Sequence, residues 1–437
     1  MLDEPRAPQL RHLLRRLRID TTPLKSSRDF RLLWFGGSVS FIGSMVTYVA
    51  LPYQVAEITG SYVAVGVLGV VELLPLIVFG LYGGALADAV DRRRLVLVTE
   101  ICFTAVSALL VVNAVLAHPM VWLLYVASFV YAILDGLQRP SLDALIPRIV
   151  PPDQLAAAGA MNTLRMNIGT IAGPALGGVI IAILGVGAAY ALDVISYAAS
   201  LVALALMRAV PPPVGGVKPS LRGIQEGLQY AVSRKDLLGT YAVDLVAMTF
   251  AFPYALFPFV AQHFDAPWSL GLLYSAPYVG SMAATLTSGW SSRVHHHGRY
   301  IAVAAAAWGL AIALFGLAPT LPLALFFLAL AGAADMISGL FRGLMWNLTI
   351  PDELRGRMAG IELLSYSVGP SLGQVRASFG AQLTSLQTSI YVGGFFTVIA
   401  VGAVTLMLPG LWRFDDRTDE NAVRQRRLRE QDGTVDS

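Results

Sequence analysis

Charged side chains inside the long apolar runs of this sequence are the first candidates for chemistry. Glu72 lies about ten residues into one such run and has no charged neighbour in the sequence. A charge in the middle of a bilayer costs about 2.5–3.5 kcal/mol, so an ionisable group there points to function. Because burial disfavours the charged form of a carboxyl group, Glu72 is a candidate for carrying a proton. The alternative is a protonated Glu72 that only hydrogen-bonds a neighbouring helix.

Asp135, Arg139 and Asp143 are spaced four residues apart in a later apolar run. They share one face of a helix and can partly neutralise one another, which leaves one negative charge. Arg165, in the next run, is a candidate partner for that charge. We expect this set to act in gating or coupling, and a purely structural charge ladder is the alternative.

Asp335 also lies in the middle of an apolar run, and Arg342 shares its helix face seven residues later. Other acidic residues lie nearer the ends of their runs and are weaker candidates, namely Asp193, Asp244 and Glu362. We therefore assign proton coupling to three carboxyl groups, those of Glu72, Asp135 and Asp335.

The elements that carry these charges are long and apolar. Of the 437 residues, 56% are hydrophobic and 14% are charged, whereas about 25% of the residues of a soluble domain are charged. A hydrocarbon core of about 30 Å needs about 20 helical residues. We predict twelve transmembrane helices, at residues 30–55, 62–87, 95–117, 120–146, 156–183, 187–207, 237–261, 268–290, 300–317, 321–349, 358–382 and 389–408.

Lysine and arginine residues outside these spans fall in the two terminal segments, in the middle connection and in the loops after even-numbered spans. The positive-inside rule therefore predicts that both termini and the middle connection are cytoplasmic. The net charge of +3 follows from this distribution and does not indicate a nucleic-acid partner. We divide the chain into a basic N-terminal segment, a first six-helix half, a cytoplasmic linker, a second half and a cytoplasmic tail, at residues 1–29, 30–207, 208–236, 237–408 and 409–437.

Small residues are concentrated in the fifth predicted span. Gly169, Gly173 and Gly177 are four residues apart, so they form a groove along one helix face. Such a groove allows helix backbones to approach closely in lipid. Pro174 has no N–H group for the carbonyl of Thr170, so the helix can bend at this point. Tight packing in any polytopic protein is the alternative interpretation.

The pattern Gly169-xxx-Gly173-Pro174-xx-Gly177-Gly178 resembles the fifth-helix antiporter motif of the major facilitator superfamily. In that superfamily the motif marks exporters rather than uptake permeases. The resemblance implies an all-α membrane protein with the major facilitator fold, in which twelve transmembrane helices form two parallel-repeat halves. It also implies that a thin, bendable fifth helix serves the rocking of one half against the other.

The end of the second predicted span resembles the other signature of the superfamily. The matching residues include Gly84, Asp88, Arg92 and Arg93. In the family the aspartate takes part in a cytoplasmic charge lock, and an ordinary positive-inside loop is the alternative. Asp91 stands where the signature has glycine, so the turn must form without positive φ there or with Asp91 in the left-handed region.

The chain repeats itself. The segment 152–155 recurs at 351–354, the segment 173–177 recurs at 369–373, and Asp135 has a counterpart in Asp335. Three ordered matches at nearly one offset indicate two homologous halves, with a substrate site near mid-membrane between them. In the superfamily, helices one, four, seven and ten line this site. The aromatic residues that fall on these helices are Tyr48, Tyr131, Tyr254 and Trp346. An aromatic wall would suit a bulky, partly aromatic substrate.

Further segments resemble bacterial enterobactin exporters and the adjoining drug-efflux branch, at residues 24–25, 30–31, 49–54, 84–94 and 287–289. We predict a proton-coupled secondary transporter that exports a small amphipathic molecule, either a siderophore or a drug-like compound, across the bacterial cytoplasmic membrane. A broad-specificity multidrug efflux pump is the alternative. We expect a monomer whose partners are its substrate, protons and the lipid bilayer.

Other classes of protein fit the sequence poorly. A primary pump would carry the nucleotide-binding pattern G-x-x-x-x-G-K-[ST], which is absent. An enzyme acting on lipid would need a cluster such as H-E-x-x-H or a Ser/His/Asp set, and no histidine lies well inside a span. A non-transporting receptor would not need the carboxyl groups in the membrane. Cys102 is the only cysteine, so we expect no cysteine metal site and no cofactor.

Overall fold

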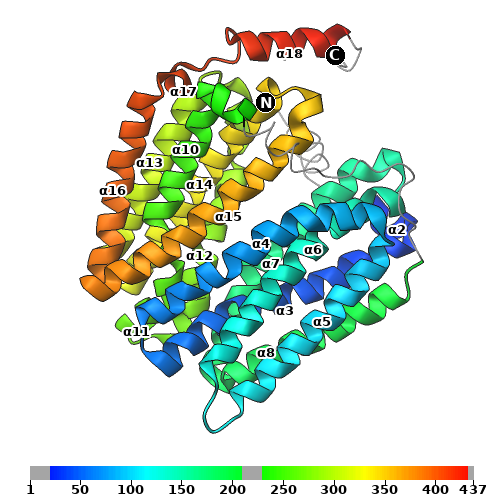
Figure 1. Ribbon diagram of the computed structural model, residues 1–437, viewed down its shortest axis with the longest axis vertical. Coiled ribbons are helices and arrows are strands. Elements are labelled where there is room, and N and C mark those ends of the chain that lie inside the picture. Colours follow the sequence, from blue (N-terminus) through cyan, green and yellow to red (C-terminus); the bar gives the residue numbers. More distant parts are fainter. Residues whose placement is uncertain (1–19, 209–228, 432–437) are drawn as a thin grey trace, which may run out of the picture.

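The computed structural model describes residues 20–208 and 229–431, and all regular structure in these residues is helical (Figure 1). Most of the predicted N-terminal segment and of the linker lies outside the described residues. The helices of the first half, after the short α2 (Thr22–Ser26), are α3 (Arg28–Thr59), α4 (Tyr62–Ala89), α5 (Arg92–Ala114), α6 (Val121–Ile149), α7 (Leu155–Leu184) and α8 (Val186–Ala205).

The second half follows the same order of long helices. Its elements are α10 (Lys235–Ala251), α11 (Phe257–His263), α12 (Leu270–Leu286), α13 (His297–Gly316), α14 (Leu321–Thr349), α15 (Asp352–Leu383) and α16 (Leu386–Met407), followed by α17 (Pro409–Arg413) and α18 (Glu420–Gln431). Ten segments of the described chain are long and apolar enough to cross a membrane. The 17-residue α12 and the more polar α15 complete the twelve predicted spans.

The predicted span at residues 237–261 lies within a segment, Lys235–His263, that is long and apolar enough to cross a membrane, but the segment is not one continuous helix. Helix α10 ends at Ala251, and a 3₁₀ turn (η2, Tyr254–Leu256) separates it from α11. Pro253 causes this break, because its ring restricts the preceding residue to extended conformations. Phe252 accordingly has φ −106° and ψ 95°.

The helix boundaries follow from local chemistry. Ser27 and Ser61 cap the N-termini of α3 and α4 by accepting hydrogen bonds from backbone N–H groups. Asp91 caps α5 in the same way, with φ −61°, so the turn before α5 forms without positive φ at that residue. Gly60 lies between α3 and α4 with φ 58°, a left-handed conformation that glycine adopts at little cost.

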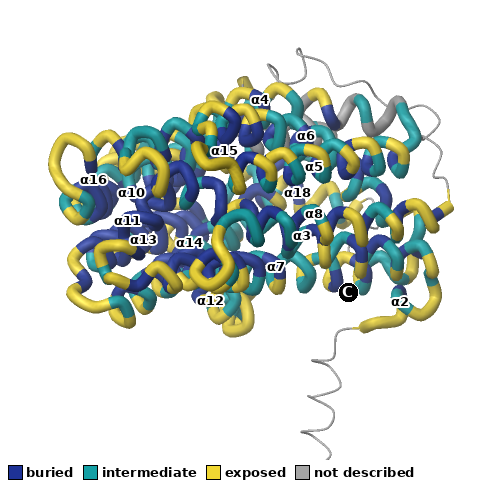
Figure 2. Tube along the Cα trace, turned by 90° about the horizontal axis from the view of Figure 1, so that it is seen from below, coloured by how far each residue is buried: buried dark blue, intermediate teal, exposed yellow. Residues whose placement is uncertain are grey.

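Within the first half α3 packs against α7 and α8, and α4 packs against α6; within the second half α13 packs against α14 and α16. Exposed residues occur along the long helices of both halves (Figure 2). Large apolar side chains are among them, including Leu74, Ile195, Leu286 and Leu406. An exposed apolar surface of this kind suits a lipid environment.

Two pairs of helices make the largest contacts between the halves, α7 with α12 and α4 with α15. Gly178 of α7 packs directly on the backbone of Gly271 of α12. Ser275 donates a hydrogen bond of 2.7 Å to the carbonyl of Ile171, one turn before Pro174. These contacts lie at the end of the bundle where α3 turns into α4 and α12 begins, which we call the closed end.

Candidate transport cavity

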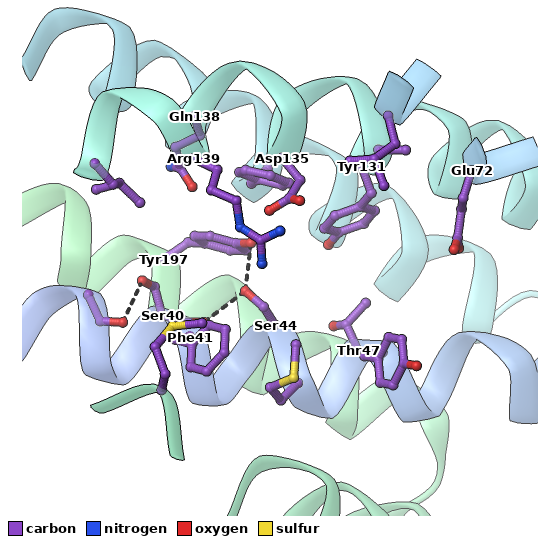
Figure 3. Close-up of a pocket in the computed structure, with 18 of the residues that line it drawn as sticks. Ser40, Phe41, Ser44, Thr47, Glu72, Tyr131, Asp135, Gln138, Arg139 and Tyr197 are labelled. Atoms are coloured by element: carbon purple, nitrogen blue, oxygen red, sulfur yellow. Dashed lines mark hydrogen bonds between the residues drawn. The ribbon is translucent and has the colours of Figure 1, made fainter. Parts of the chain in front are cut away.

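A cavity of about 480 Å³ lies against the inner faces of the first six long helices (Figure 3). All but three of its lining residues come from α3 to α8. The three exceptions are Tyr254 of η2, Tyr274 of α12 and Gln374 of α15. The cavity is therefore built mainly by the first half and is covered by the second half near the closed end.

Glu72 projects from α4 into this cavity (Figure 3). Its carboxyl group accepts a short hydrogen bond from the hydroxyl of Ser128 on α6. No ion pair among the described residues includes Glu72. The carboxyl group predicted to stand alone in the sequence thus also has no cationic partner in the described structure.

Asp135, Arg139 and Asp143 line the same cavity from α6. Arg139 reaches from α6 toward the opposite wall formed by α3 and Tyr197 (Figure 3). In the described part of the chain none of the three forms an ion pair within 4.0 Å. The residues of the predicted ladder thus line the cavity wall without direct ion pairs, and Arg139 and Asp143 still interact electrostatically.

Arg165 of α7 lies between two carboxyl groups and interacts electrostatically with both, those of Asp143 and Glu100. Its guanidinium group packs against Gly37 of α3 so closely that a side chain at Gly37 would collide with it. The cavity lining holds four carboxyl groups and two guanidinium groups, so its formal charge is −2 when all are ionised. These groups are Glu72, Glu100, Asp135, Asp143, Arg139 and Arg165.

Glu100 also lines the cavity and was not among the predicted site residues. Its side chain is only 4% exposed. One oxygen accepts a hydrogen bond of 3.0 Å from Ser200 of α8, and the other has no hydrogen-bond partner among the described residues. Glu100 lies two turns inside the apolar run of α5. A carboxyl group at that depth in a membrane costs free energy, so this position could have indicated a functional residue.

Three of the four predicted aromatic residues line the cavity, namely Tyr48, Tyr131 and Tyr254. Tyr274, which was not predicted, contacts Tyr48 edge to face with ring centroids 5.6 Å apart. Trp346 is not among the lining residues. It stacks on Tyr241 and donates a hydrogen bond of 3.0 Å to Thr240, so it packs α14 against α10 instead.

The second half has its own buried charges. Arg342 of α14 forms an ion pair with Asp244 of α10, which also accepts a hydrogen bond of 2.8 Å from Ser365. Asp335 lies 4.0 Å from the other terminal nitrogen of Arg342, and its side chain is 43% exposed. Asp335 is outside the cavity lining. Asp335 and Arg342 share a helix face, as predicted, but the close ion pair of Arg342 is with Asp244 on α10.

The arginines after α4 contact their own half of the molecule. Arg93 donates hydrogen bonds of 2.7 and 2.8 Å to the carbonyls of Leu204 and Ala205, the last residues of α8. Arg92 donates a bond of 3.0 Å to the carbonyl of Ala144. Arg93 thus adds hydrogen bonds at the C-terminus of α8, where helix carbonyls lack the full set of intrahelical donors. The surroundings of Gly84 and the side chain of Asp88 lie outside what the structure describes.

The glycines of α7 face two different neighbours. Gly169, Gly173 and Gly177 lie against α3 of the same half, where a side chain would meet Phe41, Met45 or Val46. Gly178 faces α12 of the other half. The motif therefore combines a packing face within the first half with contacts to α12 of the other half, at Ile171, Pro174 and Gly178.

A family model for transmembrane secretion effectors matches residues 20–429. The chain belongs to this family. It is a multi-pass transporter of the bacterial inner membrane and a member of the major facilitator superfamily, and its relatives are transporters rather than enzymes. The enterobactin exporter EntS of Citrobacter koseri is 29% identical over 396 residues, which cover 90% of this chain and 94% of that protein. The enterobactin exporter EntS of Shigella dysenteriae serotype 1 is 26% identical over 389 residues, which cover 88% and 92%.

Solved structures support the fold of this transporter. The nucleoside transporter NupG superposes with a TM-score of 0.65 at 12% identity and covers 87% of this chain and 98% of its own. A bacterial homologue of the iron transporter ferroportin, in the inward-facing state, superposes with a TM-score of 0.63 at 13% identity and covers 88% and 99%. The two halves of six helices are thus arranged as in the major facilitator fold.

Proposed function

We propose that this transporter exports a small amphipathic molecule across the cytoplasmic membrane in exchange for protons. The observation that carries the proposal is the cavity of about 480 Å³ in which Glu72 has one hydroxyl partner and no cationic partner among the described residues. A carboxyl group in such surroundings favours its neutral form until a favourable partner arrives. A substrate that provides hydrogen bonds or positive charge would therefore release the proton.

The distribution of basic residues supports an orientation with both termini in the cytoplasm. In this orientation the closed end is periplasmic. Arg139 and Asp143 are exposed and lie toward the cytoplasmic end of α6, so substrate would enter from the cytoplasm. We also take residues 30–207 and 237–408 as the two moving halves.

The two candidate substrate classes are supported by different features. The relatives named enterobactin exporters favour a siderophore, and the tyrosine and serine hydroxyls of the lining can hydrogen-bond its polar groups. The excess of carboxyl groups over guanidinium groups favours an organic cation and hence broader drug efflux. Aromatic side chains at the closed end offer stacking and cation–π contacts to either class.

Everted membrane vesicles with an imposed pH gradient distinguish these possibilities. Enterobactin and ethidium are the two probes, and vesicles from cells without the transporter are the control. Uptake of enterobactin alone supports siderophore export, and uptake of both supports broad efflux. If neither probe enters in a way that a protonophore abolishes, the proposal of proton-driven export of these molecules is wrong.

A further inference from the structure

Asp193 of α8 is the most deeply buried carboxyl group among the described residues, with an exposed fraction of 0%. It lies behind the cavity wall and is not part of the lining. Its closeness to the end of its span made it a weak candidate in the sequence. In the structure, hydroxyl groups from three other helices converge on it.

One oxygen of Asp193 receives all of the close contacts. Its Oδ2 lies 2.8 Å from the hydroxyl of Thr47 on α3, 2.9 Å from that of Ser107 on α5 and 3.0 Å from that of Tyr131 on α6. The other oxygen, Oδ1, has only a long contact of 3.5 Å with Ser196. The Ser196 hydroxyl donates its hydrogen to the backbone carbonyl of Asp193 at 2.8 Å instead.

The hydrogens of this cluster can be counted. The hydroxyls of Ser107 and Tyr131 are also within hydrogen-bond distance of each other, 2.5 Å apart, so four contacts join four oxygens. Three hydroxyl groups supply only three hydrogens. A fifth contact, from Ser107 to the carbonyl of Phe103 at 3.0 Å, needs a hydrogen as well. With Asp193 ionised, the five oxygen–oxygen contacts share only three hydrogens. A proton on Asp193 adds a fourth hydrogen, so that one more of these contacts becomes a hydrogen bond.

No ion pair in the described part of the chain balances the charge of Asp193 when its carboxyl group is ionised. A Cβ atom at Gly43 of α3 would lie 2.9 Å from the Oδ1 of Asp193, so at this point Oδ1 faces the backbone of α3 and no side chain. The titratable groups that interact with Asp193 are Tyr131 of α6 and Tyr190 and Tyr197 of α8. The charged groups next to these are Glu100 of α5, which bonds Ser200 of α8, and Arg165 of α7, which interacts with Glu100.

The cluster is connected to the cavity through two of its hydroxyl groups. Thr47 and Tyr131 line the cavity, and both point into the space between α3 and α6 (Figure 3). A bound molecule that donates a hydrogen bond to the Tyr131 oxygen makes the Tyr131 hydroxyl a stronger donor to Asp193, because hydrogen bonds in a chain polarise one another. A stronger donor favours the ionised carboxylate.

We propose that Asp193 is a second proton-binding group of the transporter and that Thr47 and Tyr131 couple its protonation to the occupancy of the cavity. A substrate that carries hydroxyl, amine or cationic groups then releases the proton of Asp193 as it binds. The coupling role rests on the proposed function, whereas the protonation of Asp193 does not.

Infrared spectroscopy of the protein in liposomes tests protonation without a substrate. Across a pH titration we expect a carboxylic acid C=O band that is missing in Asp193→Asn. In Thr47→Val the band should persist to higher pH, because a carboxylate with one donor fewer holds its proton more strongly. Thr397→Val, which alters a buried threonine of α16 in the other half, is the matched control and should leave the band unchanged. If the wild-type titration contains no component that Asp193→Asn removes, the proposal is overturned. If Asp193→Asn does not fold, a Thr47→Val titration equal to the wild type overturns it.

Proton release on addition of ethidium or enterobactin to everted vesicles tests the coupling. We expect fewer protons released per molecule transported in Asp193→Asn than in the wild type. Exchange that keeps its wild-type ratio in Asp193→Asn overturns the coupling role. If wild-type vesicles transport neither probe but the infrared band behaves as expected, the proposed function fails and the protonation site stands.

Discussion

At the scale of single residues, the behaviour of Glu72 is set by what surrounds it. Its carboxyl group meets the hydroxyl of Ser128 and a cavity lined by tyrosines, and the basic groups of the lining, Arg139 and Arg165, are on other helices. Glutamine has nearly the same shape and keeps the hydrogen bond to Ser128, but it cannot carry a proton. We therefore expect Glu72→Gln to insert normally and to lose proton-driven export.

The measurement is proton release from everted vesicles on addition of ethidium at an imposed pH gradient, normalised to protein in the membrane. Glu57→Gln, at the exposed end of α3, is the control and should behave like the wild type. Undiminished release from Glu72→Gln would remove this residue from the mechanism.

The ion pair between Asp244 and Arg342 makes a different prediction, because both side chains are about 95% buried. Removing one partner of a buried pair leaves an uncompensated charge and typically costs about 3–5 kcal/mol. We expect a loss of this order in Asp244→Asn and a much smaller loss in the double variant Asp244→Asn/Arg342→Met. The free energy of unfolding in detergent provides the comparison.

Arg417 supplies the control, because its side chain is 55% exposed beside Asp415 and Arg417→Gln should change this free energy little. A double variant as unstable as Asp244→Asn alone would contradict the interpretation that the cost comes from the unpaired charge.

At the scale of elements, substitutions in α7 can distinguish effects on stability from effects on transport. Gly178 touches Gly271 of the other half, whereas Gly173 touches Met45 of its own half. Overpacking a tight contact typically costs about 1–3 kcal/mol. In Gly178→Leu this cost should fall on the state in which the closed end is formed, so we expect normal insertion and impaired transport.

Gly173→Leu should instead lower the stability of the protein in every state. The control is Gly159→Leu in the same helix, since a side chain there would meet no atom within 4 Å. Ethidium efflux per molecule in the membrane and the melting temperature separate the two effects. If Gly178→Leu transports like Gly159→Leu, the contact between α7 and α12 does not have to form during transport.

The sequence predicted the helices well because lipid demands long apolar runs, and hydropathy alone locates such runs. It did not reveal the interruption of the helix at Phe252 and Pro253, because the apolar run continues across it. It placed Tyr48 and Tyr131 on the correct helices and Tyr254 in the correct span, but it could not tell that Trp346 faces α10. The contacts of Asp193 join residues up to 146 positions apart, so spacing along one helix could not reveal them.

At the scale of the whole molecule, the closed end is where the halves meet. A side chain placed on Gly69 of α4 would lie with its Cβ 3.3 Å from the Cβ of Gln374 on α15, close to the separation of about 3.5–4.5 Å in disulfides. Cys102 is the only native cysteine, so Cys102→Ser provides a clean background. We expect Gly69→Cys/Gln374→Cys to form a crosslink that stops transport.

Dithiothreitol should restore transport in the crosslinked protein, and each single cysteine variant in the same background should be active with and without oxidant. Crosslinked protein that continues to export ethidium would show that the closed end need not open during the cycle.

The one-sided construction of the cavity has a consequence for how such a carrier can change its cargo. Because nearly all of the lining belongs to α3–α8, a bound molecule is held by the first half. The second half mainly covers it. The residues that select the substrate and the residues that close over it then lie in separate parts of the sequence. Mutations in the first half can retune what is carried while the second half is left untouched, so a new cargo can be acquired without rebuilding the hinge.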